Sequence, residues 1–230
     1  MMDAHLTPPG PPLPVDYGGE TVWLLPERAL YWPAGRVLFV ADIHLGKAAT
    51  FSALGQPVPA GTTRENLARL SQLLRHYPSS QLVFLGDFLH AAQARTPSVL
   101  AELAAWRSEF AALDCVLVRG NHDSRAGDPP ASLGIRVVDE PHLLGPFAAC
   151  HHPQRHATHN VVAGHLHPAL NLHGPGRDRA RLPCFCIEPG MAILPAFGEF
   201  TGGWSVPRET GRSLYAVGGQ RVWRLPDVVS

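Results

Sequence analysis

The sequence predicts an α/β fold in which two β-sheets pack together in one domain. Strands and helices alternate between residues 36 and 123, short strands without helices follow residue 130, and 45% of the 230 residues are hydrophobic. A chain of this length and composition can bury one large core. No apolar run approaches the ~20 residues of a membrane span, so we expect no contact with a membrane.

The first half of the chain has the order strand, helix, strand, helix, strand. The predicted strands, 36–42, 81–87 and 115–123, are nearly continuous apolar runs, which is typical of strands buried on both faces. The helix over 62–77 carries leucines at helical spacing, and the helix over 97–113 has a proline in its first turn. This alternation predicts parallel strands joined by right-handed crossovers.

Short strands follow residue 130, separated by Gly, Pro and Asn turns. They are the runs IRVVDE, FAACHH, NVVAGH, CFCIE, MAIL, SLYAVGG and RVWRL. Their spacing, with little helix between them, predicts a second, antiparallel or mixed sheet that packs on the first.

The first 20 residues differ in composition from the rest of the chain. They hold five prolines between Pro8 and Pro14, without the basic and apolar segments of a signal peptide. We therefore expect a flexible, polyproline-like leader over 1–20, a single domain over 21–230, and a cytoplasmic protein.

The charge of the chain is balanced, with 19 basic and 19 acidic residues. A neutral chain argues against the extended basic surface that non-specific nucleic-acid binding usually requires, although a local basic patch stays possible. The four cysteines, Cys115, Cys150, Cys184 and Cys186, lie in apolar runs without a CxxC pair, so we expect buried free thiols.

Polar residues follow five of the predicted strands, at the point where each strand ends. They are Asp42-Ile43-His44, Gly86-Asp87, Gly120-Asn121-His122-Asp123, His151-His152 and Gly164-His165-Leu166-His167. Ligands of open α/β sheets bind beyond the carboxyl ends of the strands, where these clusters fall. In an extended segment, positions two apart face the same side, so His165 and His167 can present two imidazoles to one point. Converging neutral imidazoles indicate a metal site.

The order DxH, GD, GNHD, H, GHxH resembles that of the calcineurin-like metallophosphoesterases, over roughly residues 36–168. The segments ADIHLGKAATFSALGQPVPAGTTRENLARL, GHLHP and LPAFGEFTGG are similar to a bacterial subfamily associated with a DNA ligase and a helicase in DNA repair. This resemblance implies the four-layer α/β/β/α sandwich of that family and a binuclear metal centre. Two divalent ions there would activate water and stabilise charge on a phosphoryl group.

The resemblance also implies a set of metal ligands. Asp87 stands alone at a central strand end and is the candidate to bridge two ions. The family pattern assigns Asp42, His44 and His167 to one ion, and Asn121, His151 and His165 to the other. His152 stays an alternative to His151, because only one of two adjacent strand residues faces the metals. Such mixed ligands suit Mn²⁺, which we expect, as well as Fe and Zn²⁺.

Further residues are assigned to catalysis and to substrate binding. By the family pattern His122 protonates the leaving oxygen or stabilises the phosphoryl charge, with a structural histidine that orients the loop as the alternative. We expect Asp123 to hold the His122 ring in the required tautomer. Arg177, Arg179 and Arg181 alternate and can contact phosphates from one face of a β-ribbon, although a solvated loop is the alternative. Residues 46–61 form a long connection of the kind that often acts as a lid or binding loop. We interpret four other histidines as exposed loop residues: His90, His156, His159 and His173.

The resemblance predicts a metal-dependent phosphodiesterase, and more specifically a nuclease in a repair system with DNA ligase and helicase partners. Two alternatives stay open. One is a phosphodiesterase or phosphatase for small molecules such as cyclic nucleotides, which the neutral charge of the chain and its lack of a basic stripe keep open. The other is a repair scaffold without catalytic activity, which the complete set of ligands argues against.

Overall fold

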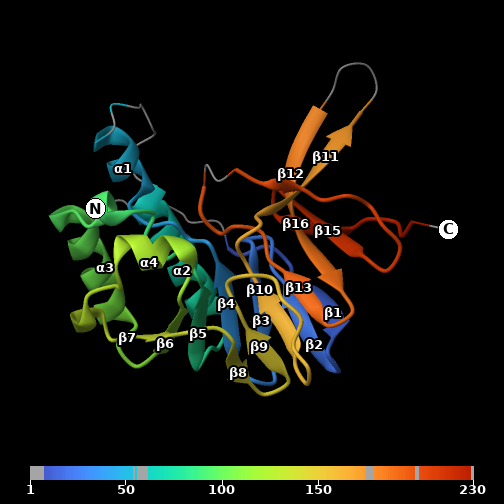
Figure 1. Ribbon diagram of the computed structural model, residues 1–230, viewed down its shortest axis with the longest axis horizontal. Helices are drawn as coiled ribbons and strands as arrows, with labels where there is room; N and C mark the ends of the chain where they lie inside the picture. Colours follow the sequence, from blue (N-terminus) through green and yellow to red (C-terminus); the bar gives the residue numbers. More distant parts are fainter. Residues whose placement is uncertain (1–7, 54, 56–61, 175–178, 200–201, 229–230) are drawn as a thin grey trace.

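Two sheets packed face to face form the body of the computed structural model, which describes residues 8–53, 55, 62–174, 179–199 and 202–228 (Figure 1). The first sheet holds seven strands in chain order: β1 (Leu13–Tyr17), β2 (Glu20–Leu24), β3 (Ala29–Trp32), β4 (Val37–Ala41), β5 (Gln81–Leu85), β6 (Asp114–Val118) and β7 (Ile135–Val138). Strands β1 to β4 are antiparallel to their neighbours, and β4 to β7 are parallel. The predicted parallel crossovers are confirmed.

The second sheet is mixed and comes from the last 90 residues. Its strands are β8 (His142–Leu144), β9 (Phe147–Ala149), β10 (Asn160–Ala163), β11 (Pro168–His173), β12 (Arg179–Glu188), β13 (Met191–Ile193), β14 (Trp204–Ser205), β15 (Ser213–Gly218) and β16 (Arg221–Arg224). Strands β9, β10 and β13 are parallel, whereas β12 pairs antiparallel with β11, β13 and β15. The hairpin of β11 and β12 projects from the sandwich (Figure 1).

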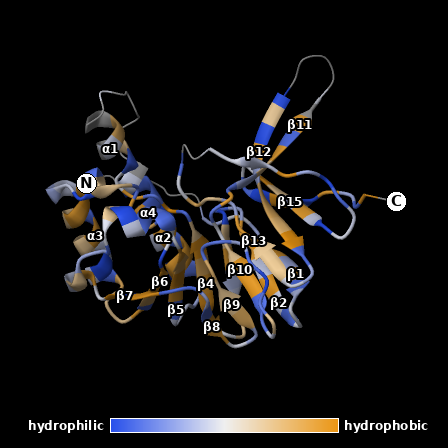
Figure 2. Ribbon diagram, viewed as in Figure 1, coloured by the Kyte–Doolittle hydropathy of each residue, from blue (hydrophilic) through white to orange (hydrophobic). Residues whose placement is uncertain are grey.

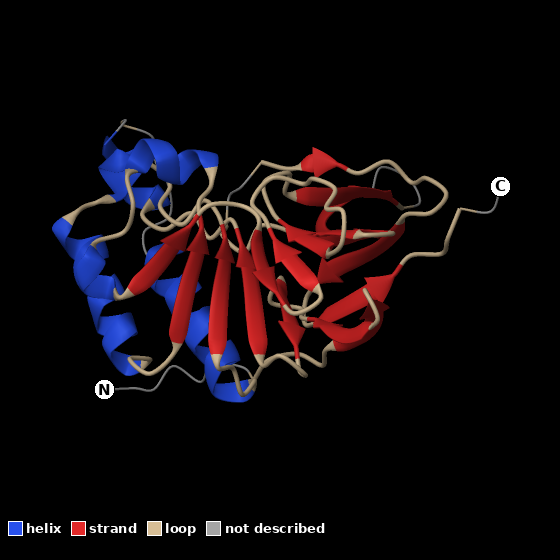
Figure 3. Cartoon of the chain, turned by 60° about the horizontal axis from the view of Figure 1, so that its bottom comes forward, coloured by secondary structure: helices blue, strands red, loops and turns tan. Residues whose placement is uncertain are grey.

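The helices lie against the first sheet (Figure 3). They are α1 (Lys47–Ala53), α2 (Thr62–His76), α3 (Pro97–Glu109) and α4 (Asn121–Ala126), with short 3₁₀ turns at Ala92–Ala94 and Ala131–Leu133. The expected stripe of α2 is buried, with Leu67, Leu70 and Leu73 packed in the same cluster as Trp106 of α3. Such a stripe stabilises the helix mainly through tertiary packing.

The two-sheet sandwich is confirmed, but the expected fourth layer is not formed. Beyond Leu133 the described part of the chain contains no helix, so the second sheet has no helical cover. Ala148, Val161 and Ala163 form a separate cluster on this sheet and are nevertheless fully buried. The described architecture is therefore α/β/β.

The core between the sheets is formed by residues that alternate with those facing the helices. In β4, Phe39 faces the second sheet, whereas Leu38 and Val40 face the helices. Phe147 of β9 stacks on Tyr17 and meets Trp32 edge-on, with ring centroids 5.7 and 5.1 Å apart. Burying such a side chain contributes roughly 1.5–3 kcal/mol. Figure 2 shows hydrophobic residues concentrated along the strands of both sheets.

The prediction of a flexible leader over residues 1–20 is wrong from Leu13 onward. Residues 13–17 form β1, which pairs with β2, and the hydroxyl of Tyr17 donates to the carbonyl of Val161 in the second sheet. These contacts outweigh the effect of Pro14, which is tolerated in an edge strand. Residues 1–7 lie outside the described residues. The run IRVVDE was expected in the second sheet, but it forms β7 at the edge of the first.

Two other expectations concern the cysteines and the membrane. All four cysteines are free and buried, as expected. Among the described residues, no helix is long and apolar enough to span a bilayer.

Candidate metal centre

The polar residues identified from the sequence meet at one edge of the sandwich, where strands of both sheets end. Asp42 directly follows β4, and Asp87 lies two residues after β5. Asn121 begins α4 after β6, while His151 and His165 each lie two residues after their strands, β9 and β10. Parallel strands end at a common edge, and for this reason loops distant in sequence converge there.

Five of these residues have a left-handed backbone. Seven non-glycine residues of the described chain have positive φ, and five of the seven are expected ligands: Asp42, His44, Asp87, His165 and His167. Their φ values lie between 47° and 70°. This conformation is uncommon for residues with a Cβ, although Asp and His adopt it more readily than most. Such backbone is concentrated at functional sites, where the surrounding structure maintains it.

Glycines allow the loops to approach one another closely. A Cβ at Gly86, where φ is 79°, would lie 2.1 Å from Nδ1 of His151. A Cβ at Gly120 would lie 2.5 Å from Oδ1 of Asp87. Both distances are far below van der Waals contact, so a larger residue at either position would displace a candidate ligand. Glycine, which has no Cβ, permits this close approach.

The first group of candidate ligands is formed by Asp42, His44 and His167, whose ligand atoms lie within 4.8 Å of one another. Nε2 of His167 lies 3.5 Å from Oδ1 of Asp42. The Nδ1 of His167 donates to the carbonyl of Gly202 over 3.0 Å, so the neutral ring has its lone pair on Nε2. Both facing atoms are buried and have no hydrogen-bond partner. A cation between them would satisfy both lone pairs.

The second group joins His151, Asn121 and His165. Nδ1 of His151 donates to the carbonyl of Leu85 over 3.0 Å, which leaves the lone pair on Nε2. That Nε2 lies 2.9 Å from Oδ1 of Asn121 and 3.0 Å from Nδ1 of His165. Nε2 of His151 and Oδ1 of Asn121 are thus two acceptors that face each other, an arrangement that a cation stabilises.

The Asp87 carboxylate faces both groups with different oxygens. Its Oδ2 lies 3.8 Å from Nε2 of His44, and its Oδ1 lies 3.5 Å from Nε2 of His151. The residue is only 2% exposed. Imidazole, carboxylate and amide ligands of this kind suit Mn, Fe or Zn ions. The residues present therefore fit a pair of divalent cations with Asp87 between them.

The protonation of His44 and His165 suits metal binding, whereas Asp42 favours a proton on His167 that a bound cation would displace. Burial, together with the smaller effect of nearby His167, lowers the pKa of His44 to about 2, so His44 is neutral at neutral pH. Burial and the neighbouring His151 likewise lower the pKa of His165. Burial also acts to lower the pKa of His167, but its contact with Asp42 outweighs that effect and raises it. Neutral imidazoles are the form that binds metals.

His151 and His152 pack on each other with ring centroids 4.6 Å apart, but they differ in burial and in hydrogen-bond partners. The His151 side chain is fully buried and faces Asp87, whereas the His152 side chain is 45% exposed and its Nδ1 lies 2.7 Å from Oε1 of Glu140. The other oxygen of Glu140 accepts hydrogen bonds from the backbone N–H groups of both histidines. Glu140 thus holds this turn, a role that the sequence did not indicate. The geometry favours His151 as the ligand of the second group.

His122 lies beside the two groups, as expected. Its Nε2 lies 3.9 Å from Oδ2 of Asp87, and its backbone N–H donates to Oδ1 of the same carboxylate over 3.0 Å. The Nδ1 of His122 donates to the carbonyl of His90 over 2.9 Å. The rings of His90 and His122 stack at 5.6 Å, and His90 stacks in turn on Phe51. His90 is therefore part of the site, contrary to the interpretation of it as an exposed loop residue.

Asp123 does not hold the ring of His122, and that prediction is wrong. Its two carboxylate oxygens accept hydrogen bonds from the backbone N–H groups of Phe88 and Gly120, each over 2.9 Å. Burial raises the pKa of Asp123, and these hydrogen bonds oppose the shift. The carboxylate instead connects the loops that carry Asp87 and Asn121. Acidic side chains at a helix start commonly accept hydrogen bonds from free backbone N–H groups, and Asp123 does so here in place of a contact with His122.

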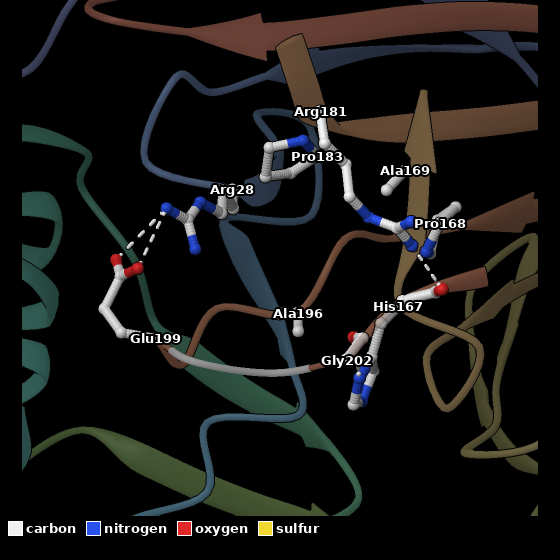
Figure 4. Close-up of a pocket in the computed structure, with 10 residues that line it drawn as sticks. Arg28, His167, Pro168, Ala169, Arg181, Pro183, Ala196, Glu199 and Gly202 are labelled. Atoms are coloured by element: carbon white, nitrogen blue, oxygen red, sulfur yellow. Dashed lines mark hydrogen bonds and ion pairs between the residues drawn. The ribbon is translucent and has the colours of Figure 1, made fainter. Parts of the chain in front are cut away.

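A pocket borders the first group at His167 (Figure 4). Arg181 lines it, and its guanidinium donates to the carbonyl of Gly203 and to Oγ of Ser205. Arg179 is exposed two residues earlier in β12, and Arg177 lies outside the described residues. Arg28 lines the opposite wall, paired with Glu199 over 3.1 Å. A hairpin position for the arginines is confirmed for Arg179 and Arg181.

The other loop histidines contribute nothing visible to the centre. His156 and His159 pack on each other with ring centroids 5.0 Å apart and hydrogen-bond within their own turn. The side chain of His173 lies outside the described residues. Within the connection over 46–61, residues 47–53 form α1, and residues 54 and 56–61 are not among those described. A lid role for this segment stays a prediction.

Residues 35–155, slightly more than half of the chain, match the calcineurin-like phosphoesterase family. The chain belongs to this family. The phosphoesterase is similar to the crystal structure of nuclease MPE from Pseudomonas putida, with 50% identity, 94% of this chain and 100% of that chain covered, and a TM-score of 0.83. It also matches YfcE, a phosphoesterase from E. coli, at 16% identity over 79% of this chain and 87% of that one, with a TM-score of 0.37. No curated protein sequence matches it.

The family and the geometry agree on the class of reaction. This phosphoesterase is a metal-dependent hydrolase of phosphoric esters, and its family implies divalent metal ions. The clusters of His and Asp described above supply candidate sites for those ions. The predicted resemblance is thereby confirmed.

Proposed function

We propose that this phosphoesterase is a binuclear-metal phosphodiesterase that cleaves DNA internally, as an endonuclease in DNA repair. The observation that carries the binuclear assignment is the position of Asp87, with one carboxylate oxygen toward each ligand group. Support for DNA as substrate comes from the 50% identity to a protein described as a nuclease. Association with a DNA ligase and a helicase belongs to the same proposal and rests on the sequence resemblance.

In this proposal, seven residues hold the two ions. Asp42, His44 and His167 bind one, Asn121, His151 and His165 bind the other, and Asp87 binds both. The bound ions supply a nucleophile from water at neutral pH and stabilise charge on the phosphoryl oxygens. We assign Mn²⁺ as the activating ion, with Fe and Zn²⁺ as the alternatives that the same ligands accept.

His122 provides the proton for the leaving group. Hydrolysis forms a bond between water oxygen and phosphorus and breaks the bond to the leaving oxygen, which must gain a proton. Because Nδ1 of His122 donates to the His90 carbonyl, the ring is held with Nε2 toward Asp87 and the ligand groups. A ring protonated on both nitrogens keeps that hydrogen bond and releases the Nε2 proton to the leaving oxygen. His90 positions this acid.

A single panel of substrates tests the proposal. Purified protein freed of metal would be supplied with Mn²⁺, Fe²⁺ or Zn²⁺ and given single- and double-stranded circular DNA, an aryl phosphodiester, the corresponding monoester and cyclic nucleotides. We expect Mn²⁺-dependent conversion of a circle to linear products, because an endonuclease needs no end. Cleavage of cyclic nucleotides with intact DNA would support the small-molecule alternative, which the neutral charge of the chain favours. Inactivity on every substrate would support a scaffold.

The partner proposal needs its own measurement. The DNA ligase and helicase encoded in the same organism would be purified and mixed with the phosphoesterase, and the complex would be sought by analytical ultracentrifugation. Co-sedimentation supports the association, and independent sedimentation at micromolar concentration contradicts a stable complex.

A further inference from the structure

A second pocket borders the other ligand group of the centre, away from the residues that line the pocket of Figure 4. It is lined by Asn121, His152, Arg119 and Arg125, among other residues. Asn121 belongs to the second ligand group, because its Oδ1 lies 2.9 Å from Nε2 of His151. The pocket of Figure 4 borders the first group instead, because His167 lines it. One pocket therefore adjoins each end of the pair of ligand groups.

The two arginines of the second pocket differ in their surroundings. Arg119 forms ion pairs with Asp128 and Asp139 over 2.8 and 2.7 Å, so its charge is more than balanced, and Asp139 and Glu140 also line this pocket. Arg125 lies on α4, is exposed, and has no acidic partner within the described part of the chain. Its positive charge, four residues after Asn121, is therefore available to an anion in the pocket.

Arg181 is its counterpart in the first pocket. Its guanidinium contacts a carbonyl and a hydroxyl, and no carboxylate of the described residues pairs with it. Arg28 on the opposite wall is paired with Glu199. Each pocket thus combines a candidate metal ligand, one balanced arginine and one arginine without an acidic partner.

We propose that a DNA strand crosses the centre from one pocket to the other and that Arg125 binds the backbone phosphate next to the scissile one, on the side opposite Arg181. This inference rests on the proposed nuclease function and extends it. A phosphodiester chain carries a phosphate on each side of the bond to be cut, so it can engage both unbalanced arginines at once. An aryl phosphodiester or a cyclic nucleotide has no flanking phosphate to engage them. Contacts to phosphates position a nucleic acid without reading its sequence.

The test compares Arg125→Ser with Arg136→Ser under Mn²⁺. Arg136 is exposed, pairs with Asp114 and lines neither pocket, so its replacement removes the same charge elsewhere. We measure kcat/KM for a circular single-stranded DNA and for an aryl phosphodiester. One phosphate contact contributes a salt slope of about 0.7 on single strands, which corresponds to roughly a 5-fold effect near ~0.1 M salt. We expect the DNA-to-aryl ratio to fall about that much in Arg125→Ser and to be unchanged in Arg136→Ser.

The salt dependence and a conservative variant separate a contact from a structural role. In Arg125→Ser the slope of DNA cleavage against salt should flatten by about 0.7, and Arg125→Lys should restore most of it because lysine keeps the charge. Equal losses with both substrates, an unchanged salt slope, or an equal effect of Arg136→Ser would each overturn the inference. If the wild-type protein cleaves the aryl diester and leaves DNA intact, the proposed nuclease function itself fails.

Discussion

Nε2 of His167 lies 3.5 Å from Oδ1 of Asp42, and neither buried atom has a hydrogen-bond partner. The two residues come from different sheets and are 125 positions apart in the chain. Leaving a buried acceptor unsatisfied costs about 1–3 kcal/mol, so the facing pair needs either a proton on His167, whose pKa Asp42 raises, or a cation between the two atoms. A divalent cation would displace that proton and satisfy both atoms, and the predictions below follow from that arrangement.

Asp87→Asn should abolish binding of the metal pair. The substitution keeps the shape of the side chain but removes the charge that allows one residue to hold two cations. We expect fewer than two ions per chain by metal analysis and turnover lowered by more than about 100-fold. Asp114→Asn is the matched control, because Asp114 is an exposed carboxylate paired with Arg136. Two bound metals and near-normal hydrolysis in Asp87→Asn would refute the bridging role.

His122→Ala should separate catalysis from metal binding. The variant leaves every candidate ligand in place, so both ions should remain bound. Loss of a general acid slows turnover by roughly 10²–10⁴-fold. Turnover of an aryl diester, whose leaving group needs no protonation, should decrease much less in this variant than turnover of DNA. Metal loss in this variant would mean that His122 is a ligand and not an acid.

Alanine at His151 and at His152 should have different effects. His151 is fully buried with Nε2 facing Asp87, whereas His152 is half exposed and contacts Glu140. We expect His151→Ala to lose the second ion and His152→Ala to keep it, as measured by calorimetric titration of Mn²⁺ into protein freed of metal. The opposite result would assign the ligand to His152.

The protein without metal should lose stability as the pH falls below 6.5. The pKa of His44 is about 2 in the folded state, whereas an unfolded histidine has an ordinary value near 6.5. Below the unfolded value only the unfolded chain takes up the proton, so acid favours unfolding. The free energy of unfolding should fall by on the order of 2 kcal/mol from pH 7 to 5 through His44 alone. The half-buried His90, with a pKa of about 4, acts in the same direction.

Urea unfolding of protein in a chelator checks this pH dependence. His44→Gln removes the titrating ring, so its stability should change less between pH 7 and 5 than that of the wild type. An identical pH dependence in the two proteins would show that His44 titrates normally.

Replacing Arg177, Arg179 and Arg181 together with serine should weaken DNA cleavage more than cleavage of an aryl diester. Each lost phosphate contact flattens the salt dependence by about 0.7 on single strands. The control replaces Arg64, Arg75 and Arg136, which are exposed, paired with acids and distant from the hairpin, and so makes the same change in net charge. A parallel decrease in both activities would identify the hairpin arginines as structural.

Local patterns in the sequence predicted much of the fold. Apolar runs and helical leucine spacing located β4, β5, β6, α2 and α3 because these elements are buried, and burial leaves a periodic signature. The N-terminal strand β1 was missed because Pro14 and the four prolines that precede the strand indicate a leader when read alone. Only its pairing with β2 and the contact of Tyr17 with Val161 make it part of the sheet.

The sequence by itself determined the types of the candidate ligands and their order, because each follows a strand end and the loops carry the glycines that close approach requires. Only the tertiary structure decided which side chains share a point. Asp42 lies beside His167 and accepts a hydrogen bond from the backbone N–H of His165. His122 donates to the carbonyl of His90. Asp123 accepts a hydrogen bond from the backbone and not from His122. Those choices depend on how two sheets pack and which buried polar groups need partners, and neither is encoded in the spacing of residues along one strand.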